Sequence, residues 1–326
     1  MTKLKKIYVC ALGGTIAMAP DLESNSGSGV KPVLGGRDLV AGVSELSTIA
    51  DVTAESLISL GSANLNFSIA HAVIERAYAL AENGADGIVV TQGTDTMEEM
   101  AFLLSLVWQG SIPIVMTGAM KHPALEGADG PANLLAAVQT AIAAPKGVYV
   151  VMDGTVHDPA TVRKSHTSAL SAFVTDGGAL GSVSQGVVRL DKTLAKRPTF
   201  DIATLAAGKR VAVITPQFDD DGWQITAITA EKFDGAVIAA FGGGHVSEAW
   251  SDKLHALARE MPVVLTSRIG AGRVLTNTYG YKGAEIDLIG AGLVPAGGLT
   301  PHKARLLLML ALSQSDQKIG DAFASF

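Results

Sequence analysis

The sequence predicts an α/β protein with a larger N-terminal domain, built on a doubly wound, mostly parallel sheet, and a smaller C-terminal α/β domain. Three observations support this prediction. Short β-branched runs alternate with longer helical patterns, the runs are apolar on both faces, and the alternation restarts after a weaker stretch. A chain of 326 residues is long enough for two domains of roughly 150 residues each.

The strands predicted for the first domain are apolar throughout, which is typical of parallel strands covered on both faces. They are residues 7–12, 87–91, 112–117 and 148–152. Between them, apolar residues recur every three to four positions and predict helices. These helices are residues 69–83, 97–108 and 133–144. Ser68 is the predicted N-cap of the first helix, and Gly84 follows its end.

A weaker stretch divides the two predicted domains. Residues 191–210 carry charges, Pro198 and no strong periodicity, which indicates an interdomain linker. The N-terminal domain is therefore predicted to span residues 1–190 and the C-terminal domain residues 211–326. Alternation then resumes, with strands predicted at 211–215, 236–241 and 263–266 and helices at about 247–260 and 302–312.

Residues 18–34 differ from their surroundings because they are rich in Ser, Gly, Asn and Pro. This composition predicts a mobile loop directly after the first strand. Ligands of open α/β sheets bind beyond the carboxyl ends of the strands. The position of the loop therefore indicates a lid that covers a binding site. The alternative is a plain surface loop.

Charge and composition exclude several classes of protein. The net charge of −6, with both signs interspersed, leaves no basic face for nucleic acid. Apolar runs stay far shorter than the 18 or more residues that a membrane span needs. The single cysteine, Cys10, lies in an apolar run and is predicted to be buried rather than nucleophilic. A cytoplasmic protein is expected, and a removed leader stays open as the alternative.

Two predicted strands end in segments that place a threonine beside glycine. Gly13-Gly14-Thr15 follows the first, and Gln92-Gly93-Thr94-Asp95 follows the second, just before a helix. Glycine allows the backbone to approach a ligand, and a helix start offers N–H groups that favour negative charge. A hydroxyl held there is well placed to attack a carbonyl. The alternatives are a nucleotide-phosphate turn, whose glycine spacing neither segment fits, and simple helix capping by Thr94 and Asp95.

A hydroxyl nucleophile needs a base, and Lys164 is the candidate. A desolvated lysine close to another cation, such as the adjacent Arg163, is neutral enough to accept a proton. Asp95 then has two possible roles. It either orients this lysine or pairs with a cationic group of the substrate.

The two threonine segments, Gly13–Ala17 and Gln92–Glu99, together resemble the paired signatures of the bacterial L-asparaginase and glutaminase-asparaginase family. The resemblance covers most of the chain. The other matching positions are Gly61-Ser62, Met116–Met120, Ala128–Leu134, Val150–Asp153, Lys164, Ser267-Arg268 and Pro301–Arg305.

The resemblance implies hydrolysis of L-asparagine to L-aspartate and ammonia, with no metal or organic cofactor. Thr15 would be the nucleophile that forms an acyl-enzyme, and Thr94, Asp95 and Lys164 would handle protons and water. Ser62 would hold the α-carboxylate of the substrate, and Asp95 its α-ammonium. The substrate-binding positions implied are Gly14, Ser62, Ala63, Gly93, Thr94, Asp95 and Ala119. A homotetramer, a dimer of tight dimers, is also implied, with each site closed by the C-terminal domain of a neighbouring subunit.

Three departures from the family concern the recognition of the substrate. Residues 18–34 contain no tyrosine, although the family's loop usually carries one that bonds the nucleophile. Ala63 stands where many members have a glutamine. The segment 273–285 is longer than its family counterpart and places Tyr279 or Tyr281 near the point where a neighbouring subunit would contribute a glutamate, with Glu285 a few residues further on. Tyr279 or Tyr281 is expected either to reach the active site of the neighbouring subunit or to pack in the interface between the subunits.

These departures keep other substrates open for the same nucleophile. These alternative substrates are D-asparagine, N-substituted asparagine, a β-aspartyl amide and glutamine. A third hypothesis is a non-catalytic binding protein that uses a cleft between domains. The presence of Lys164 argues against it, because a pure binder needs no lysine base beside two threonines.

Overall fold

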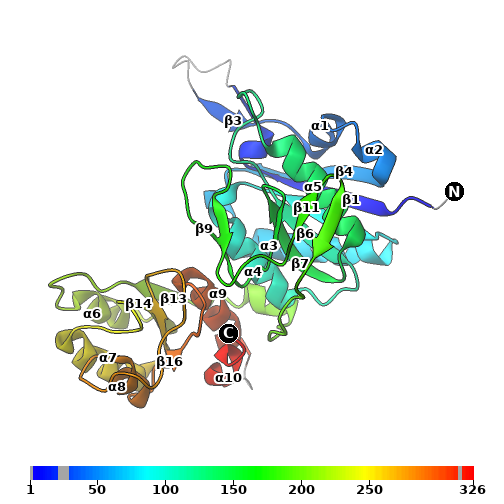
Figure 1. Cartoon of the computed structure of the whole chain (residues 1–326). Coiled ribbons are helices and arrows are strands. Elements are labelled where there is room, and N and C mark those ends of the chain that lie inside the picture. Colours follow the sequence, from blue (N-terminus) through cyan, green and yellow to red (C-terminus); the bar gives the residue numbers. More distant parts are fainter. Residues whose placement is uncertain (1–2, 21–28, 315–317) are drawn as a thin grey trace. The chain divides into compact units, whose positions relative to one another are not determined.

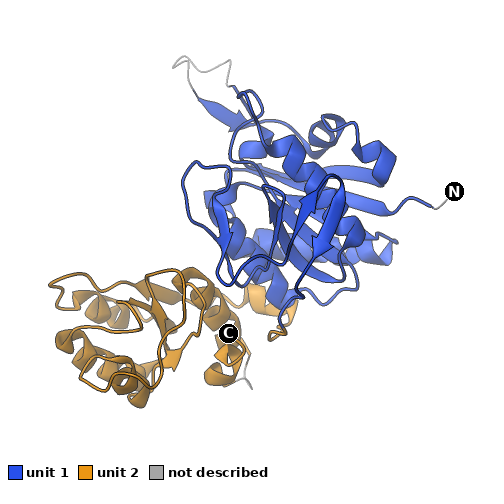
Figure 2. Cartoon of the chain, viewed as in Figure 1, with its two compact units in different colours: residues 1–195 blue, residues 196–326 orange. Residues whose placement is uncertain are grey.

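The computed structural model describes residues 3–20, 29–314 and 318–326 of the chain. It divides into two compact units, residues 1–195 and 196–326 (Figure 2). Within the described residues, the first unit contains an eight-stranded sheet and the second a four-stranded sheet (Figure 1). The predicted fold class, a larger and mostly parallel N-terminal sheet with a smaller C-terminal α/β domain, is confirmed.

The large sheet has the strand order β12-β11-β8-β7-β6-β5-β1-β4. Its parallel part comprises β1 (Lys6–Gly13), β4 (Asp51–Leu60), β5 (Gly87–Thr91), β6 (Pro113–Thr117) and β7 (Gly147–Met152). The antiparallel part comprises β8 (Thr155–His157), β11 (Gly181–Ser184) and β12 (Val187–Leu190). From β1 the chain continues to β4 on one side and then to β5 on the other. The point where the strand order reverses therefore lies between β1 and β5.

Helices provide the apolar cover that this sheet needs. One face packs against α1 (Gly36–Ala41), α2 (Leu46–Ile49) and α5 (Gly130–Ala143). The strand residues on that face alternate with their neighbours, for example Ile7, Val9 and Ala11 along β1. Two more helices, α3 (Phe67–Glu82) and α4 (Met97–Val107), pack against each other beside the same sheet. Because β5, β6 and most of β7 are buried, these strands are almost entirely apolar, and only Thr91 and Thr117, at the ends of β5 and β6, depart from the predicted pattern.

Cys10 on β1 is buried and lies beside a carboxylate. Its thiol is 3.7 Å from Oε1 of Glu55 on the neighbouring β4, and Arg76 of α3 donates two hydrogen bonds to the same carboxylate. Burial raises the pKa of the Cys10 thiol to about 12, and the negative charge of Glu55 adds to the effect. The prediction that Cys10 is buried is confirmed.

The small sheet of the second unit has the order β13-β14-β15-β16, with all strands parallel. They are β13 (Val211–Ile214), β14 (Gly235–Ala240), β15 (Val263–Ser267) and β16 (Val294–Pro295). The helices are α6 (Trp223–Ala230), α7 (Glu248–Glu260), α8 (Glu285–Gly290), α9 (Pro301–Leu312) and α10 (Ile319–Phe323). Among the helices in the described parts of both units, none has the length and apolar character needed to cross a membrane.

Some local predictions were wrong. Helix α3 is capped by Asn66, whose side chain accepts a hydrogen bond from the Ile69 N–H, and Ser68 lies inside the first turn. The predicted loop 18–34 contains two short antiparallel strands, β2 (Met18–Pro20) and β3 (Val30–Pro32). Residues 21–28 of that loop lie outside the described residues.

Several short elements were not predicted. They are the ribbon of β9 (Val162–Lys164) and β10 (Phe173–Thr175), and the 3₁₀ turns η1 (Thr15–Ala17), η2 (Ser62–Asn64), η3 (Thr94–Thr96) and η4 (Ile202–Ala206). The last of these turns lies within residues 191–210. Elements of three to five residues show too little periodicity to be recognised from sequence.

Candidate active site

The two threonine segments follow adjacent parallel strands of the large sheet. Thr15 begins η1, one residue after the glycine that follows β1, and Thr94 begins η3, just beyond β5. These are the carboxyl ends on either side of the point where the strand order reverses. In open α/β sheets this is the place where ligands bind.

The backbones of the two segments meet at a pair of glycines. Gly14 has φ +81° and donates its N–H to the carbonyl of Leu60 at 2.9 Å. A Cβ atom at this position would lie 2.0 Å from the backbone nitrogen of Gly93. Only glycine allows this approach, because its positive φ disfavours other residues and the added carbon has no space. The contact places the start of the Thr15 segment beside the start of the Thr94 segment.

Replacing Gly14 with alanine is expected to destabilise the first unit by at least about 2 kcal/mol more than replacing Gly84 with alanine. Both glycines have nearly the same φ, +81° and +83°, but a Cβ at Gly84 meets nothing within 4 Å. The shared positive φ removes that part of the strain from the comparison, and the difference between the variants reports the steric clash together with the extended ψ of −175° at Gly14. Thermal or urea unfolding of the two variants measures the difference. Equal losses of stability in the two variants would show that the backbone at the Gly14–Gly93 contact can rearrange at little cost in free energy.

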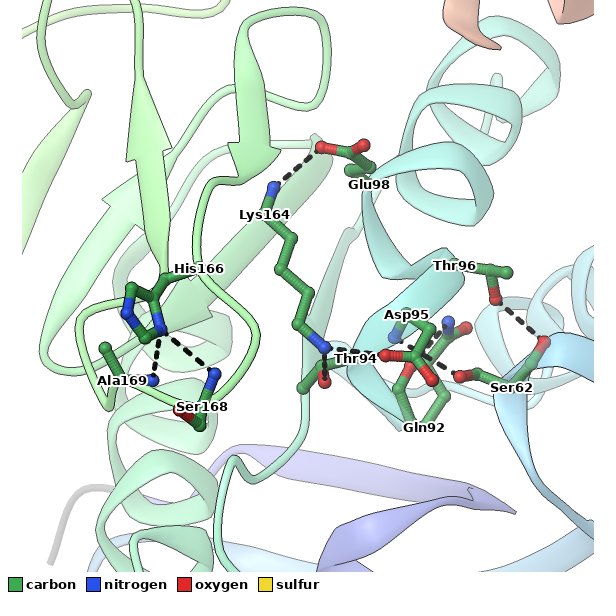
Figure 3. A network of polar contacts seen from close by, with 11 residues as sticks. Ser62, Gln92, Thr94, Asp95, Thr96, Glu98, Lys164, His166, Ser168 and Ala169 are labelled. Carbon is green, nitrogen blue, oxygen red and sulfur yellow. Dashed lines mark hydrogen bonds and ion pairs between the residues drawn. The ribbon is translucent and has the colours of Figure 1, made fainter.

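A compact cluster joins Thr94, Asp95 and Lys164 (Figure 3). Lys164 is the last residue of β9, and its Nζ lies 2.8 Å from Thr94 Oγ1 and 2.6 Å from Asp95 Oδ1. Thr94 is buried, the Lys164 side chain is 16 % exposed and that of Asp95 is 70 % exposed. The ammonium contacts a carboxylate, whereas the sequence suggested Arg163 as its charged neighbour. A lysine in this position can exchange protons with the Thr94 hydroxyl or with a water molecule.

Ser62 connects η2 to the same cluster. Its Oγ accepts the backbone N–H of Asp95 at 3.2 Å, and its carbonyl accepts the hydroxyl of Thr96 at 2.9 Å. Ser62 is itself buried, and a Cβ at Gly93 would lie 2.8 Å from its Oγ. Ala63, the next residue of η2, is exposed. The structure thus brings Ser62, Gly93, Thr94 and Asp95 together at one point.

The turn that contains Ala119 is held by a separate network. Asp129 accepts the backbone N–H groups of Met120 and Lys121 at 2.9 Å each. Asn133 of α5 donates to the carbonyl of Gly118 at 3.0 Å. Ala119 is therefore buried in a turn that follows β6, the strand next to β5. Its backbone is fixed by side chains from the start of α5.

Glu285 and the two tyrosines lie in the second unit. Oε1 of Glu285 accepts the backbone N–H groups of Thr278 and Tyr279 at 2.7 Å each, and Oε2 lies 3.1 Å from His245 Nε2. Burial raises the pKa of Glu285, but the hydrogen bonds from Tyr279 and Thr278 outweigh it, and the pKa is lowered. The carboxylate has no exposed surface, while Tyr279 and Tyr281 are 45 % and 55 % exposed. This segment therefore presents phenol rings rather than a carboxylate.

Two contacts at the cluster were missed from the sequence. Thr96 bonds the carbonyl of Ser62, and Glu98 accepts the backbone N–H of Lys164 at 2.8 Å. The only sequence signal for Thr96 and Glu98 was their position close to Thr94 at the start of a helix. Within the described parts of the chain, no three His, Cys, Asp or Glu side chains are grouped so that they could hold a metal ion.

Models of known protein families match both units of the chain. The family model "Asparaginase, N-terminal" matches residues 6–196, and "Glutaminase/Asparaginase C-terminal domain" matches residues 210–322. The chain belongs to the asparaginase family. The resemblance inferred from the two threonine segments is confirmed, and this asparaginase-family protein is a hydrolase that acts on amides.

Individual relatives align with this family member along nearly its whole length. L-asparaginase 2 of Escherichia coli is 34 % identical over 96 % of this chain and 90 % of its own. The glutaminase-asparaginase of Pseudomonas fluorescens biotype A is 32 % identical over 96 % of this chain and 88 % of its own. The crystal structure of a probable cytoplasmic L-asparaginase from Campylobacter jejuni superimposes with a TM-score of 0.86, at 30 % identity, over 99 % of this chain and 100 % of that one.

Proposed function

We propose that this asparaginase-family hydrolase converts L-asparagine and water to L-aspartate and ammonia, with Thr15 as its nucleophile. The observation that carries the proposal is the Thr94–Lys164–Asp95 cluster, with Nζ at 2.8 and 2.6 Å from its two partners. It adjoins the Thr15 segment at the point where the strand order of the sheet reverses. The E. coli relative, an L-asparaginase, supports the choice of substrate.

The reaction runs in two halves. Thr15 Oγ attacks the side-chain carbonyl carbon of asparagine and gives up its proton. The C–N bond then breaks, ammonia leaves with the added proton, and an ester of Thr15 remains. A water molecule attacks this ester, aspartate leaves, and the proton returns to Thr15. Lys164 and Thr94 handle protons and place the water, and backbone N–H groups near Thr94 and Ala119 stabilise the oxyanion.

Ser62 and Asp95 recognise the amino-acid end of the substrate. Because Ser62 Oγ accepts the Asp95 N–H, its hydroxyl hydrogen can donate to the substrate α-carboxylate. Asp95 uses Oδ1 for Lys164, and its side chain is 70 % exposed, so its second oxygen can accept the α-ammonium. The two roles weighed for Asp95 are thus compatible. Both support binding of an α-amino acid with its side-chain amide towards Thr15.

Ala63 favours a second candidate, in which the same nucleophile acts on a differently shaped amide. Its methyl group is exposed beside Ser62 and cannot form a hydrogen bond. Loss of one such contact costs about 1 kcal/mol. The candidates are D-asparagine, N-substituted asparagine, a β-aspartyl amide and glutamine, and the Pseudomonas relative is a glutaminase-asparaginase.

A substrate panel tests both candidates. Purified protein is assayed for released ammonia or amine and for the acid product with each of the five amides. L-Asparagine is expected to have the highest kcat/KM, by about 10-fold or more over glutamine, since one methylene changes discrimination by that order. An Ala63→Gln variant measures the contribution of the missing contact. A higher kcat/KM on any other amide contradicts the main proposal and supports the second.

We further propose a cytoplasmic homotetramer, built as a dimer of tight dimers, in which the second unit of a neighbouring subunit closes each site. The exposed phenols of Tyr279 and Tyr281 support a contribution from that segment, while Glu285 is engaged with its own loop. The name of the Campylobacter relative supports the cytoplasmic location. Light scattering of the purified protein and fractionation of cells test the assembly and the location.

A further inference from the structure

Lys164 lies at the end of a very short strand, outside the large sheet. Strand β9 has three residues and pairs with β10 in a separate two-stranded ribbon. The residues that follow it, 165–168, are exposed. Lysine also has a long, flexible side chain, which by itself fixes the position of its ammonium poorly. Pairing with Phe173 and the bonds from Ser165 to the Ala172 carbonyl hold Lys164 within the ribbon. A contact between the ribbon and the Thr94 segment is what sets the distance of Lys164 from Thr94.

Glu98 provides such a contact. It lies in the first turn of α4, directly after η3, and its Oε2 accepts the backbone N–H of Lys164 at 2.8 Å. Figure 3 shows Lys164 extended between two points, with Glu98 at its backbone and Thr94 and Asp95 at its tip. All three partners belong to residues 94–98. A carboxylate that accepts an N–H forms one of the stronger hydrogen bonds available in proteins.

We propose that Glu98 is a positioning residue for Lys164. By accepting the backbone N–H, it fixes the lysine so that Nζ reaches Thr94 Oγ1 and Asp95 Oδ1 at the same time. Thr94 lies in η3 and Glu98 in the first turn of α4, which follows η3 directly, so these two consecutive turns set the distance from the lysine backbone to the Thr94 hydroxyl. This inference rests on the proposed function only in that it takes Lys164 as the group that handles protons.

The effect of the bond must be separated from that of the negative charge. Acidic side chains in the first turn stabilise a helix electrostatically, and Glu99 shares that turn with Glu98. Glu98→Gln keeps an oxygen that can accept the N–H, whereas Glu98→Met has a similar length and only a weak acceptor. Glu99→Met removes the same charge from the next position and serves as the matched control.

Two measurements test the proposal. In Glu98→Met, the amide hydrogen of Lys164 is expected to exchange with solvent about 10-fold faster or more, because its hydrogen bond is lost. Its kcat is expected to fall about 10- to 100-fold with KM changed less than about 3-fold, since a small misplacement of a catalytic group has this effect. Glu99→Met is expected to stay close to the unmodified protein in both measurements, and Glu98→Gln is expected to change both clearly less than Glu98→Met, because its neutral oxygen keeps a weaker bond.

Several outcomes would overturn the proposal. They are unchanged exchange at Lys164 in Glu98→Met, an equal loss of kcat in Glu98→Gln, and an equal loss in Glu99→Met. If Glu98→Met fails to fold, Glu98→Asp keeps the charge, shortens the side chain by one methylene and is expected to change exchange and kcat in the same direction. If the unmodified protein shows no turnover of any amide in the panel, the proposed function fails, and the exchange measurement still decides the role of Glu98.

Discussion

Replacing Thr15 with alanine is expected to lower kcat for L-asparagine by about four orders of magnitude or more. The variant lacks the oxygen that forms the ester, and the neighbouring Thr94 hydroxyl is already bonded to Lys164. Binding should be nearly unchanged, because Ser62 and Asp95 are intact. A steady-state assay of ammonia release, with substrate affinity from calorimetry, measures both quantities.

Thr15→Ser supplies the matched control for this prediction. It retains an attacking hydroxyl and is expected to keep turnover within about 100-fold of the unmodified enzyme, because nucleophile and proton path both persist. Mass spectrometry of quenched reactions should detect an acyl group on residue 15 in the unmodified or serine form and none in the alanine form. Turnover by Thr15→Ala at the unmodified rate would remove Thr15 as the nucleophile.

Lys164→Met is expected to lower kcat by about 10²- to 10⁴-fold, the usual contribution of a positioned proton-transfer group. The substitution removes the Nζ that lies 2.8 Å from Thr94 and 2.6 Å from Asp95. Thermal stability should change little, because Asp95 is 70 % exposed and water can solvate its carboxylate once the lysine is gone.

Lys209→Met is a suitable control for the lysine prediction. Lys209 pairs with Asp234 at 3.1 Å in the second unit, so the variant also removes an ion pair at a partly exposed site. Its kcat should equal that of the unmodified enzyme. If Lys164→Met and Lys209→Met behave alike, proton handling by Lys164 is contradicted.

The fold was predictable where a segment carries its own signal. Residues 87–91 were predicted to form a strand and do so, because a strand buried on both faces is apolar at nearly every position. Strand β4 was missed because it is only partly buried and mixes polar residues, Glu55 among them, with apolar ones. That carboxylate is satisfied by Arg76, 21 residues along the chain, and no local pattern reports such a pairing.

The same distinction holds for the candidate site. Thr15 and Thr94 are marked by glycines beside them in the sequence, so their segments were identified directly. The bond from Lys164 to Glu98 spans 66 residues, and that from Thr96 to Ser62 spans 34. Such contacts depend on how the ribbon of β9 and the turn η2 meet the start of α4. The periodicity and turn composition of a sequence do not report how such distant segments pack against each other.

The buried thiol of Cys10 makes the protein a convenient background for site-specific labelling. Alkylating reagents react with thiolates, and a thiol with a pKa of about 12 and almost no exposed surface stays protonated and out of reach at neutral pH. A cysteine introduced at Phe218, which is 98 % exposed, would therefore take up a fluorophore or spin label selectively. Distances between such labels could then be followed during turnover without first removing a native cysteine.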